Sequence, residues 1–321
     1  MSLALLIFVA VAGLYVGANI GANDAANCIG PSVGAGLIRY RTAIIAVAAC
    51  VVLGALLQGG EVMKTVGKGI VTDPIEPLGV AVALFSGGLF VSLATFYKIP
   101  VSTSQSVVGA VAGVGVASSL NVDWSKLLTI AECWVLCPIL SMVLTYVIYR
   151  GALTAMDKAK NQKLVRRTLT WLVVVSSAYA AYSLGANNLG NAIGPISSLG
   201  GNQFNMKWLS VAGAVSMAVG ALVFGRGVAE TVGKSIIKLD LPGAFSVQVS
   251  AAIGLHVFSM MGIPVSTSQA VVGGLLGVGL LRGINTVSRR KMAEVVIGWV
   301  ATPAVGGVTS FSLYWLALRI F

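Results

Sequence analysis

Two nearly identical polar blocks interrupt otherwise apolar sequence. Residues 99–109 read Ile-Pro-Val-Ser-Thr-Ser-Gln-Ser-Val-Val-Gly, and residues 263–273 repeat ten of these eleven positions at an offset of 164. Because Pro100 and Pro264 lack an N–H and disfavour helix in the residue before them, each hydroxyl block should end one helix. The hydroxyl residues can then cap a new helix, whose free N–H groups attract anions. Simple capping would explain one copy, but two matching copies predict an anion site formed by Thr103, Ser104, Gln105, Thr267, Ser268 and Gln269.

A second pair of blocks keeps the same offset and is rich in amides. Residues 21–31 read Gly-Ala-Asn-Asp-Ala-Ala-Asn-Cys-Ile-Gly-Pro, and residues 185–195 match seven of these eleven positions. A carboxylate at membrane depth costs at least ~2.5 kcal/mol and usually marks function. Carboxylate and amide oxygens are hard ligands suited to small cations, and Gly21 and Gly30 permit an unwound backbone there, whose freed carbonyls would add further ligands. The candidate cation ligands are Asn23, Asp24, Asn27, Asn187, Asn188 and Asn191, with Ser102 and Ser266 as additional candidates.

The charge balance of the four blocks indicates what such a site would bind. A phosphate-like anion carries roughly one to two negative charges near neutral pH. The four blocks contain no Arg or Lys, and Asp24 adds a negative charge. An oxyanion held there needs bound cations, which is the physical logic of cation-coupled symport. Sodium is the first choice because the blocks contain no histidine, and proton coupling stays open as an alternative.

Two further carboxylates repeat near the end of each half. Glu132 and Glu294 lie close to Trp134…Pro138 and Trp299…Pro303, which recur at an offset of 165. They are equally well interpreted as an additional cation site or as carboxylates that pack between helices.

The elements that must position these blocks are membrane helices. The chain is 57% hydrophobic and only 10% charged, whereas a soluble domain carries about a quarter charged residues. Apolar runs near 2–18, 42–59, 78–97, 104–119 and 127–149 are followed by runs near 169–184, 208–224, 243–260, 268–281 and 292–318. We take all ten as crossings, although the short fourth run of each half also fits half of a re-entrant hairpin. The first run lacks a basic start and is treated as a retained helix and not a signal peptide.

The distribution of basic residues predicts the orientation. With the amino terminus outside, fifteen Lys and Arg residues fall on the cytoplasmic side and five outside, as membrane proteins prefer. Five crossings per half is an odd number, so the halves enter from opposite sides. The prediction is an all-α polytopic membrane protein with two inverted-topology repeats, 1–150 and 169–321. Broken helices or re-entrant hairpins form its core, a cytoplasmic linker spans 151–168, and both termini lie outside.

Composition also argues against several other classes. The net charge of +11 suggests nucleic acid, but the basic residues lie in loops between membrane runs, so no nucleic-acid partner is expected. His256 is the sole histidine and lies in an apolar run, so neither a metal cluster nor a catalytic triad forms around it. The four cysteines fit no zinc or disulfide spacing.

Residues 21–27 resemble the signature block of the inorganic phosphate transporter (PiT) family, and the hydroxyl blocks resemble its second hallmark. The resemblance covers both halves, with four blocks in the right order. It implies an inverted-repeat membrane fold and import of inorganic phosphate with sodium ions or protons. It also implies that the amide-block residues bind cations and phosphate, and that the hydroxyl-block residues form a phosphate cradle. Family members are often dimeric, so a homodimer is a further expectation.

One departure separates this chain from the family pattern. The family commonly has Asp in both amide blocks, whereas the second block here has Asn188. The number of coupled cations is therefore not fixed by the resemblance.

The sequence thus predicts a secondary transporter of the cell inner membrane, in contact with the lipid bilayer. It is expected to import inorganic phosphate by alternating access, driven by sodium, and to need no cofactor. The alternatives are a proton-coupled phosphate transporter, a passive anion channel and a membrane enzyme with a Ser nucleophile. The enzyme is disfavoured because no histidine or lysine base is in register with the serines.

Overall fold

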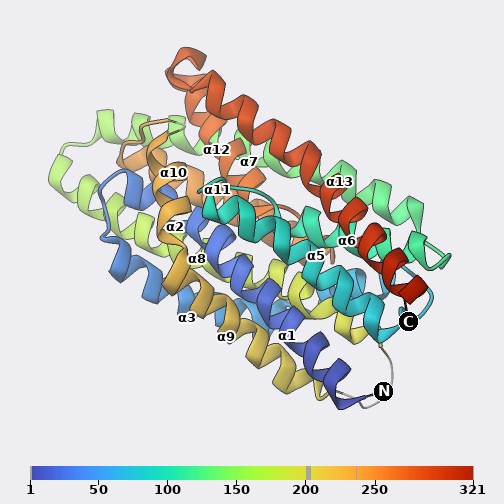
Figure 1. Ribbon diagram of the computed structural model, residues 1–321. Coiled ribbons are helices and arrows are strands. Elements are labelled where there is room, and N and C mark those ends of the chain that lie inside the picture. The colour runs from blue at the N-terminus through green and yellow to red at the C-terminus, as the bar shows by residue number, and fades with distance from the viewer. Residues whose placement is uncertain (1, 200–203, 236, 321) are drawn as a thin grey trace.

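The computed structural model describes residues 2–199, 204–235 and 237–320, and these form helices and one isolated β-bridge (Figure 1). The few remaining residues of the two predicted repeats, 1, 200–203, 236 and 321, lie outside the described part. The first half contains α1 (Leu3–Ile20), the π-helical turn η1 (Gly21–Ala25), α2 (Ala26–Gly34), α3 (Tyr40–Gln58), α4 (Gly60–Lys64), η2 (Thr65–Gly69), α5 (Pro77–Phe96), α6 (Thr103–Ala117) and α7 (Trp124–Lys158). The second half contains α8 (Gln162–Ser197), α9 (Met206–Phe224), α10 (Arg226–Ser235), α11 (Leu241–Met260), α12 (Thr267–Arg282), η4 (Ile284–Thr286) and α13 (Arg289–Ile320).

Eight continuous helical segments in the described chain are long and apolar enough to cross a membrane. They are 3–34, α3, α5, α7, α8, α9, α11 and α13. Large apolar side chains such as Leu57, Val147 and Val300 are mostly exposed, as expected of residues that face lipid hydrocarbon. The prediction of an all-helical, multi-pass membrane protein is confirmed.

The two halves run in opposite directions. Cys28 near the end of α1–α2 donates from its thiol to the Ala180 carbonyl in the middle of α8, and Gly13 lies beside Ala192, so these equivalent helices are antiparallel. The amino and carboxyl ends both lie at one end of the molecule, and the α7–α8 connection lies at the other (Figure 1). We call the latter the linker end. The structure therefore has the inverted-repeat arrangement that the odd number of runs predicted.

Each repeat packs its helices against the other repeat. A Cβ added to Gly21 would overlap the Met217 carbonyl of α9, and one added to Gly185 would overlap the Val51 carbonyl of α3. In the same way, Gly109 of α6 lies against α13, and Gly273 of α12 lies against α7. Backbones approach this closely only where a side chain is absent. The two halves are therefore packed together through the pairs α1–α9, α3–α8, α6–α13 and α7–α12.

The fourth helix of each half is short. At 1.5 Å per residue, the 15 residues of α6 and the 16 of α12 span roughly 22–24 Å, less than the ~30 Å hydrocarbon core. Alone, these two helices are therefore too short to cross it, whereas α5 and α11, with 20 residues each, are long enough. Each short helix pairs with the helix before it as a hairpin, α5–α6 and α11–α12, which fits the re-entrant alternative that the run lengths allowed. Each hairpin returns to the end where it began, since Asn121 beyond α6 bonds Thr72 and Asp73 ahead of α5.

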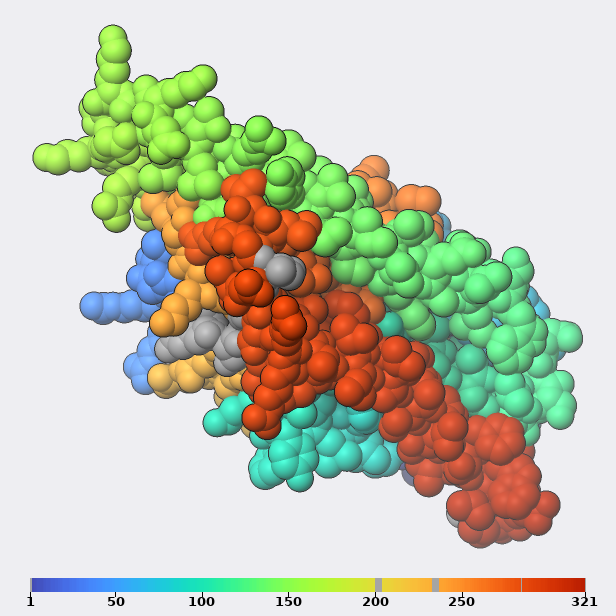
Figure 2. All heavy atoms as spheres, turned by 90° about the horizontal axis from the view of Figure 1, so that it is seen from above, coloured from blue at the N-terminus to red at the C-terminus, as the bar shows by residue number. Residues whose placement is uncertain are grey.

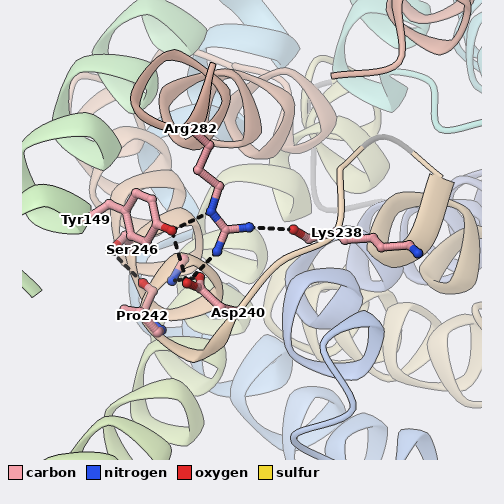
Figure 3. A network of polar contacts seen from close by, with 7 residues as sticks. Tyr149, Lys238, Asp240, Pro242, Ser246 and Arg282 are labelled. Carbon is pink, nitrogen blue, oxygen red and sulfur yellow. Dashed lines mark hydrogen bonds and ion pairs between the residues drawn. The ribbon is translucent and has the colours of Figure 1, made fainter. Parts of the chain in front are cut away.

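The second hairpin is tied at the linker end by a polar network (Figure 3). Arg282 forms an ion pair with Asp240 and donates from Nε to the Tyr149 hydroxyl at 2.6 Å and from Nη1 to the Lys238 carbonyl at 2.9 Å. The Tyr149 hydroxyl in turn donates to Asp240 at 3.0 Å. The first hairpin has a weaker counterpart at the opposite end, where Tyr314 donates to Glu76 at 3.4 Å.

The predicted linker 151–168 contains mostly helix. It comprises the last turns of α7, a connection at 159–161 and the first turns of α8. These helix ends project beyond the rest of the molecule (Figure 2). The predicted repeat boundaries thus fall inside two long helices.

Candidate substrate site

The two hydroxyl blocks form matching helix starts. After the extended residues that contain Pro100 and Pro264, Ser102 and Ser266 act as N-caps and accept from the N–H groups of Gln105 and Gln269, each at 3.2 Å. No described group accepts from the N–H groups of the next residues, Thr103 and Ser104 in one helix and Thr267 and Ser268 in the other. The predicted helix breaks and caps are confirmed. Two helix starts offer free donors at the core of the protein.

The amide blocks do not unwind. The first forms the π-helical turn Gly21–Ala25 within a continuous helical segment, and the second is α-helical throughout α8. The expectation of an unwound backbone at Gly21 and Gly30 is wrong. A π-turn widens the helix by one residue without leaving its backbone unsatisfied, and such turns are frequent at functional sites. Here Asn27 Nδ2 donates to the Asn23 carbonyl at 3.2 Å inside the widened segment.

Each amide block holds the helix break of its own repeat. Asn23 donates to the Ile99 carbonyl at 3.1 Å and accepts from the Val101 N–H at 3.1 Å. Asn187 donates to the Ile263 carbonyl at 3.3 Å. In each repeat the amide block therefore contacts the hydroxyl block directly. The first Asn of the amide block holds the helix break of the hydroxyl block in place.

Contacts across the repeats join all four blocks into one cluster. Ser104 of the first repeat donates to the Val265 carbonyl of the second at 2.9 Å, and Asn191 donates to the Ser104 hydroxyl at 2.9 Å. Asn191 also donates to Asn188, which donates to Thr267 at 3.4 Å. The predicted phosphate and cation residues thus lie together at the interface between the halves.

The cluster has an excess of oxygen acceptors without donors. Its side chains are at most 3% exposed. Buried polar atoms are normally hydrogen-bonded, so each exception needs a reason. Seven oxygens of the four blocks lack a partner among the described residues: Asp24 Oδ2, Asn27 Oδ1, Thr103 Oγ1, Gln105 Oε1, Asn187 Oδ1, Asn191 Oδ1 and Gln269 Oε1. Carboxylate, amide and hydroxyl oxygens are ligand types suited to hold small cations.

The candidate additional carboxylates lie elsewhere. Glu132 is exposed on α7, and Glu294 is exposed at the start of α13, where it pairs with Arg290 and Lys291 at 3.3 and 2.7 Å. Neither bonds a residue of the four blocks in the described chain. Asp24 is the only acidic residue of the four blocks, and Lys98, although next to a break, is exposed.

The sequence reasoning missed two hydroxyl groups. Thr95 accepts from Asn23 Nδ2 at 3.0 Å, and Ser259 accepts from Asn187 Nδ2 at 2.9 Å. They stand just ahead of the hydroxyl blocks, at the repeat offset of 164. A search for paired hydroxyls at that offset would have found them.

Comparison with known proteins agrees with this arrangement. The phosphate transporter family matches the chain over residues 20–160 and again over 151–310, one match for each half. The chain belongs to the phosphate transporter family. Its members are transporters, so the alternative of a membrane enzyme with a Ser nucleophile is wrong.

Relatives and one solved structure show how far this family likeness extends. A protein of Pyrococcus furiosus named "Putative phosphate permease" is 29% identical, over 90% of each chain. A protein of the same kind from Helicobacter pylori is 29% identical over 91% of this chain and 72% of its own. A solved structure described as the sodium-dependent phosphate transporter matches with a TM-score of 0.90 at 25% identity, over 99% of this chain and all of that one.

Proposed function

We propose that this member of the phosphate transporter family is a sodium-coupled symporter that imports inorganic phosphate by alternating access. The observation that carries this proposal is the cluster of seven partnerless buried oxygens beside two helix starts with free N–H groups. The helix starts supply donors for an oxyanion, and the oxygens supply ligands for cations. A site with both features binds an anion and cations together.

Each block has a distinct part in the proposed site. Phosphate would lie between the starts of α6 and α12, held by the hydroxyl-block residues and their N–H groups. Sodium ions would lie between the phosphate and the amide-block residues, with Asp24 as the only negative ligand. Sodium is supported by six carboxylate and amide oxygens without a described partner, since amide oxygens and an ionised carboxylate only accept, and by the described sodium dependence of the structural neighbour.

The direction of transport rests on the membrane orientation. The linker end carries the densest group of basic residues, and the positive-inside preference therefore puts it in the cytoplasm, with both termini outside. We assign 1–150 and 169–321 to the two repeats and 151–168 to the cytoplasmic connection. The inverted repeat supports alternating access, because equivalent elements lie at opposite ends of one site.

The test is uptake of labelled phosphate into proteoliposomes with the sodium and proton gradients varied separately. Saturable uptake that follows the inward sodium gradient at constant pH is expected. Uptake that follows only the proton gradient would replace sodium by protons, and non-saturable flux that ignores both gradients would indicate a passive anion channel.

A further inference from the structure

A hollow of about 560 Å³ lies along the last turns of α7, which project with the start of α8 beyond the rest of the molecule (Figure 2). Its lining residues form two rows at helical spacing: Tyr146, Arg150, Thr154 and Lys158 in one, and Val147, Gly151 and Ala155 in the other. All of them except the partly buried Tyr146 are exposed. A Cβ added to Gly151 would meet open space, so the second row forms an open floor of apolar and small residues beside the two cations of the first row.

The hollow lies where α7 leaves the hydrocarbon core of the bilayer. Glu132 and Arg150 are the charged residues on either side of the uncharged stretch 133–149. At 1.5 Å per residue they are about 27 Å apart along the helix, close to the ~30 Å thickness of the hydrocarbon. Arg150 therefore lies at the boundary with the lipid headgroups, and Lys158 lies about 12 Å further out. Trp171 of α8 is at a similar distance from the α7–α8 connection and is 63% exposed, as expected of an interfacial aromatic residue.

The two cations of the hollow have no anionic partner in the described part of the chain. Neither the Arg150 guanidinium nor the Lys158 ammonium takes part in any of its ion pairs. The segment 150–168 contains six basic residues and a single acidic one, Asp157. The hollow therefore presents unbalanced positive charge at the level of the headgroups, beside an apolar floor. A ligand that complements both features has an anionic head and a hydrocarbon tail.

The equivalent place in the second repeat has different chemistry. At the offset of 165 that relates the two Trp…Pro pairs, Gly151 of α7 corresponds to Leu316 of α13, and Arg150 corresponds to Trp315. The guanidinium carbon of Arg319 lies 3.8 Å from the centre of the Trp315 ring. A larger side chain thus replaces the glycine of the open floor, and the nearby cation is already held by an aromatic ring. The unpaired cations and the open floor are therefore features that α7 does not share with its counterpart.

We propose that the hollow on α7 binds one anionic phospholipid from the leaflet at the linker end. The lipid phosphate would lie between Arg150 and Lys158, because basic residues next to a membrane helix attract anionic headgroups. An acyl chain would follow the floor to Val147 and then Val143, which are 61% and 52% exposed and lie one turn apart on the same row. A zwitterionic lipid fits less well, since the two cations would repel its ammonium group.

The test is native mass spectrometry of the full chain in detergent, titrated with phosphatidylglycerol or phosphatidylcholine. The wild-type protein should bind one phosphatidylglycerol per chain, roughly tenfold or more tightly than phosphatidylcholine. Arg150→Gln and Lys158→Gln should each weaken phosphatidylglycerol binding about fivefold, the effect expected when one basic residue is removed from an anionic headgroup. Lys160→Gln and Lys163→Gln are matched controls, because they remove the same charge from the same segment outside the hollow, and each should change binding less than about twofold.

A further variant tests the shape of the hollow without changing its charge. Gly151→Phe fills the floor and should weaken phosphatidylglycerol binding roughly tenfold or more. If this variant does not elute as folded protein, Ala155→Phe changes another exposed residue of the same floor and takes its place. Equal binding of the two lipids would overturn the proposal. Equal losses in the hollow variants and the lysine controls would also overturn it, because they would show a diffuse attraction of the whole basic segment.

Excess inorganic phosphate distinguishes the lipid headgroup from the free anion. Phosphatidylglycerol should stay bound, because inorganic phosphate has no chain that could occupy the apolar floor. Its displacement by inorganic phosphate would overturn the lipid site. The measurement needs no ion gradient and no membrane orientation, so its result is independent of the proposed transport. Lipid binding as expected with failed sodium-driven uptake would refute sodium symport alone, and normal uptake without lipid preference would refute the lipid site alone.

Discussion

Ser104 and Ser268 occupy equivalent positions, yet the structure predicts different effects when each is replaced by alanine. The Ser104 hydroxyl donates to the Val265 carbonyl and accepts from Asn191, both at 2.9 Å, so it cross-links the two repeats. Within the described part of the chain, the Ser268 hydroxyl bonds only its neighbour Ser266, at 3.0 Å. The Ser104 hydroxyl therefore stabilises the packing of the two repeats, whereas the Ser268 hydroxyl can turn towards a bound anion.

Magnitudes follow from these contacts. Ser104→Ala removes two hydrogen bonds, worth about 1–3 kcal/mol of unfolding free energy together, and Ser268→Ala removes one, worth about 0.5–1.5 kcal/mol. A hydroxyl that bonds a charged phosphate contributes about 1.5–3 kcal/mol to binding, so Ser268→Ala should raise the half-saturating phosphate concentration roughly ten- to 150-fold. Ser104→Ala should raise it less, because its proton is already taken by Val265.

The assay pairs thermal unfolding of the purified protein with phosphate uptake in proteoliposomes. Ser86→Ala is the matched control, since this buried serine has no hydrogen-bond partner among the described residues and lies outside the four blocks. The reasoning would be refuted if Ser104→Ala unfolds like the control while Ser268→Ala loses more stability. Equal changes in half-saturation for both serines would show that the Ser104 proton turns to phosphate despite Val265.

The other predictions concern charge, close packing and the linker-end network. Asp24→Asn should raise the half-saturating sodium concentration at least tenfold and change the half-saturating phosphate concentration less. Asn188→Asp should slow uptake at low sodium because its added charge repels phosphate. Phosphate uptake measured against sodium concentration checks both predictions. Gly109→Ala should lower the unfolding free energy by about 1–3 kcal/mol, because the new Cβ overlaps the Pro303 carbonyl oxygen. Gly151→Ala, inside α7, meets open space and should raise the unfolding free energy by up to about 1 kcal/mol in the same assay, because alanine favours helix over glycine. Arg282→Gln should lower the unfolding free energy by about 1–2 kcal/mol in that assay. The ion pair itself contributes little to this value because it is partly exposed.

Each of these three predictions can fail clearly. Wild-type sodium dependence in Asp24→Asn would make that carboxylate structural and move the cation elsewhere. Equal unfolding free energies of Gly109→Ala and Gly151→Ala would mean that α6 and α13 can move apart without loss of stability. An Arg282→Gln protein as stable as wild type would show that Tyr149 and Asp240 hold the hairpin without the guanidinium.

The repeats and the helix breaks could be predicted from the sequence because they depend on local chemistry, and the matching offsets indicated that the four blocks lie together. Proline at positions 100 and 264 ends a helix in any surroundings, and Ser102 caps the next helix through its own backbone. The continuous helix through the first amide block could not be predicted. Glycine, asparagine and Pro31 there suggest unwinding, but long-range partners satisfy the backbone, since Gln248 of α11 donates to the Cys28 carbonyl at 3.0 Å. Such a contact, 220 residues away along the chain, leaves no pattern in a single sequence.

The crossed packing of the two halves has a consequence for biosynthesis. The glycine face of α1 that meets α9 through Gly21 and Met217 has to wait for 196 further residues to be synthesised. At roughly 5–20 residues per second, that delay is about 10–40 s. During it, the first half sits in the bilayer with its small-residue faces and buried amides uncovered, and α6 is without α13. Packing between the two halves can therefore be completed only after α9 and α13 have been synthesised.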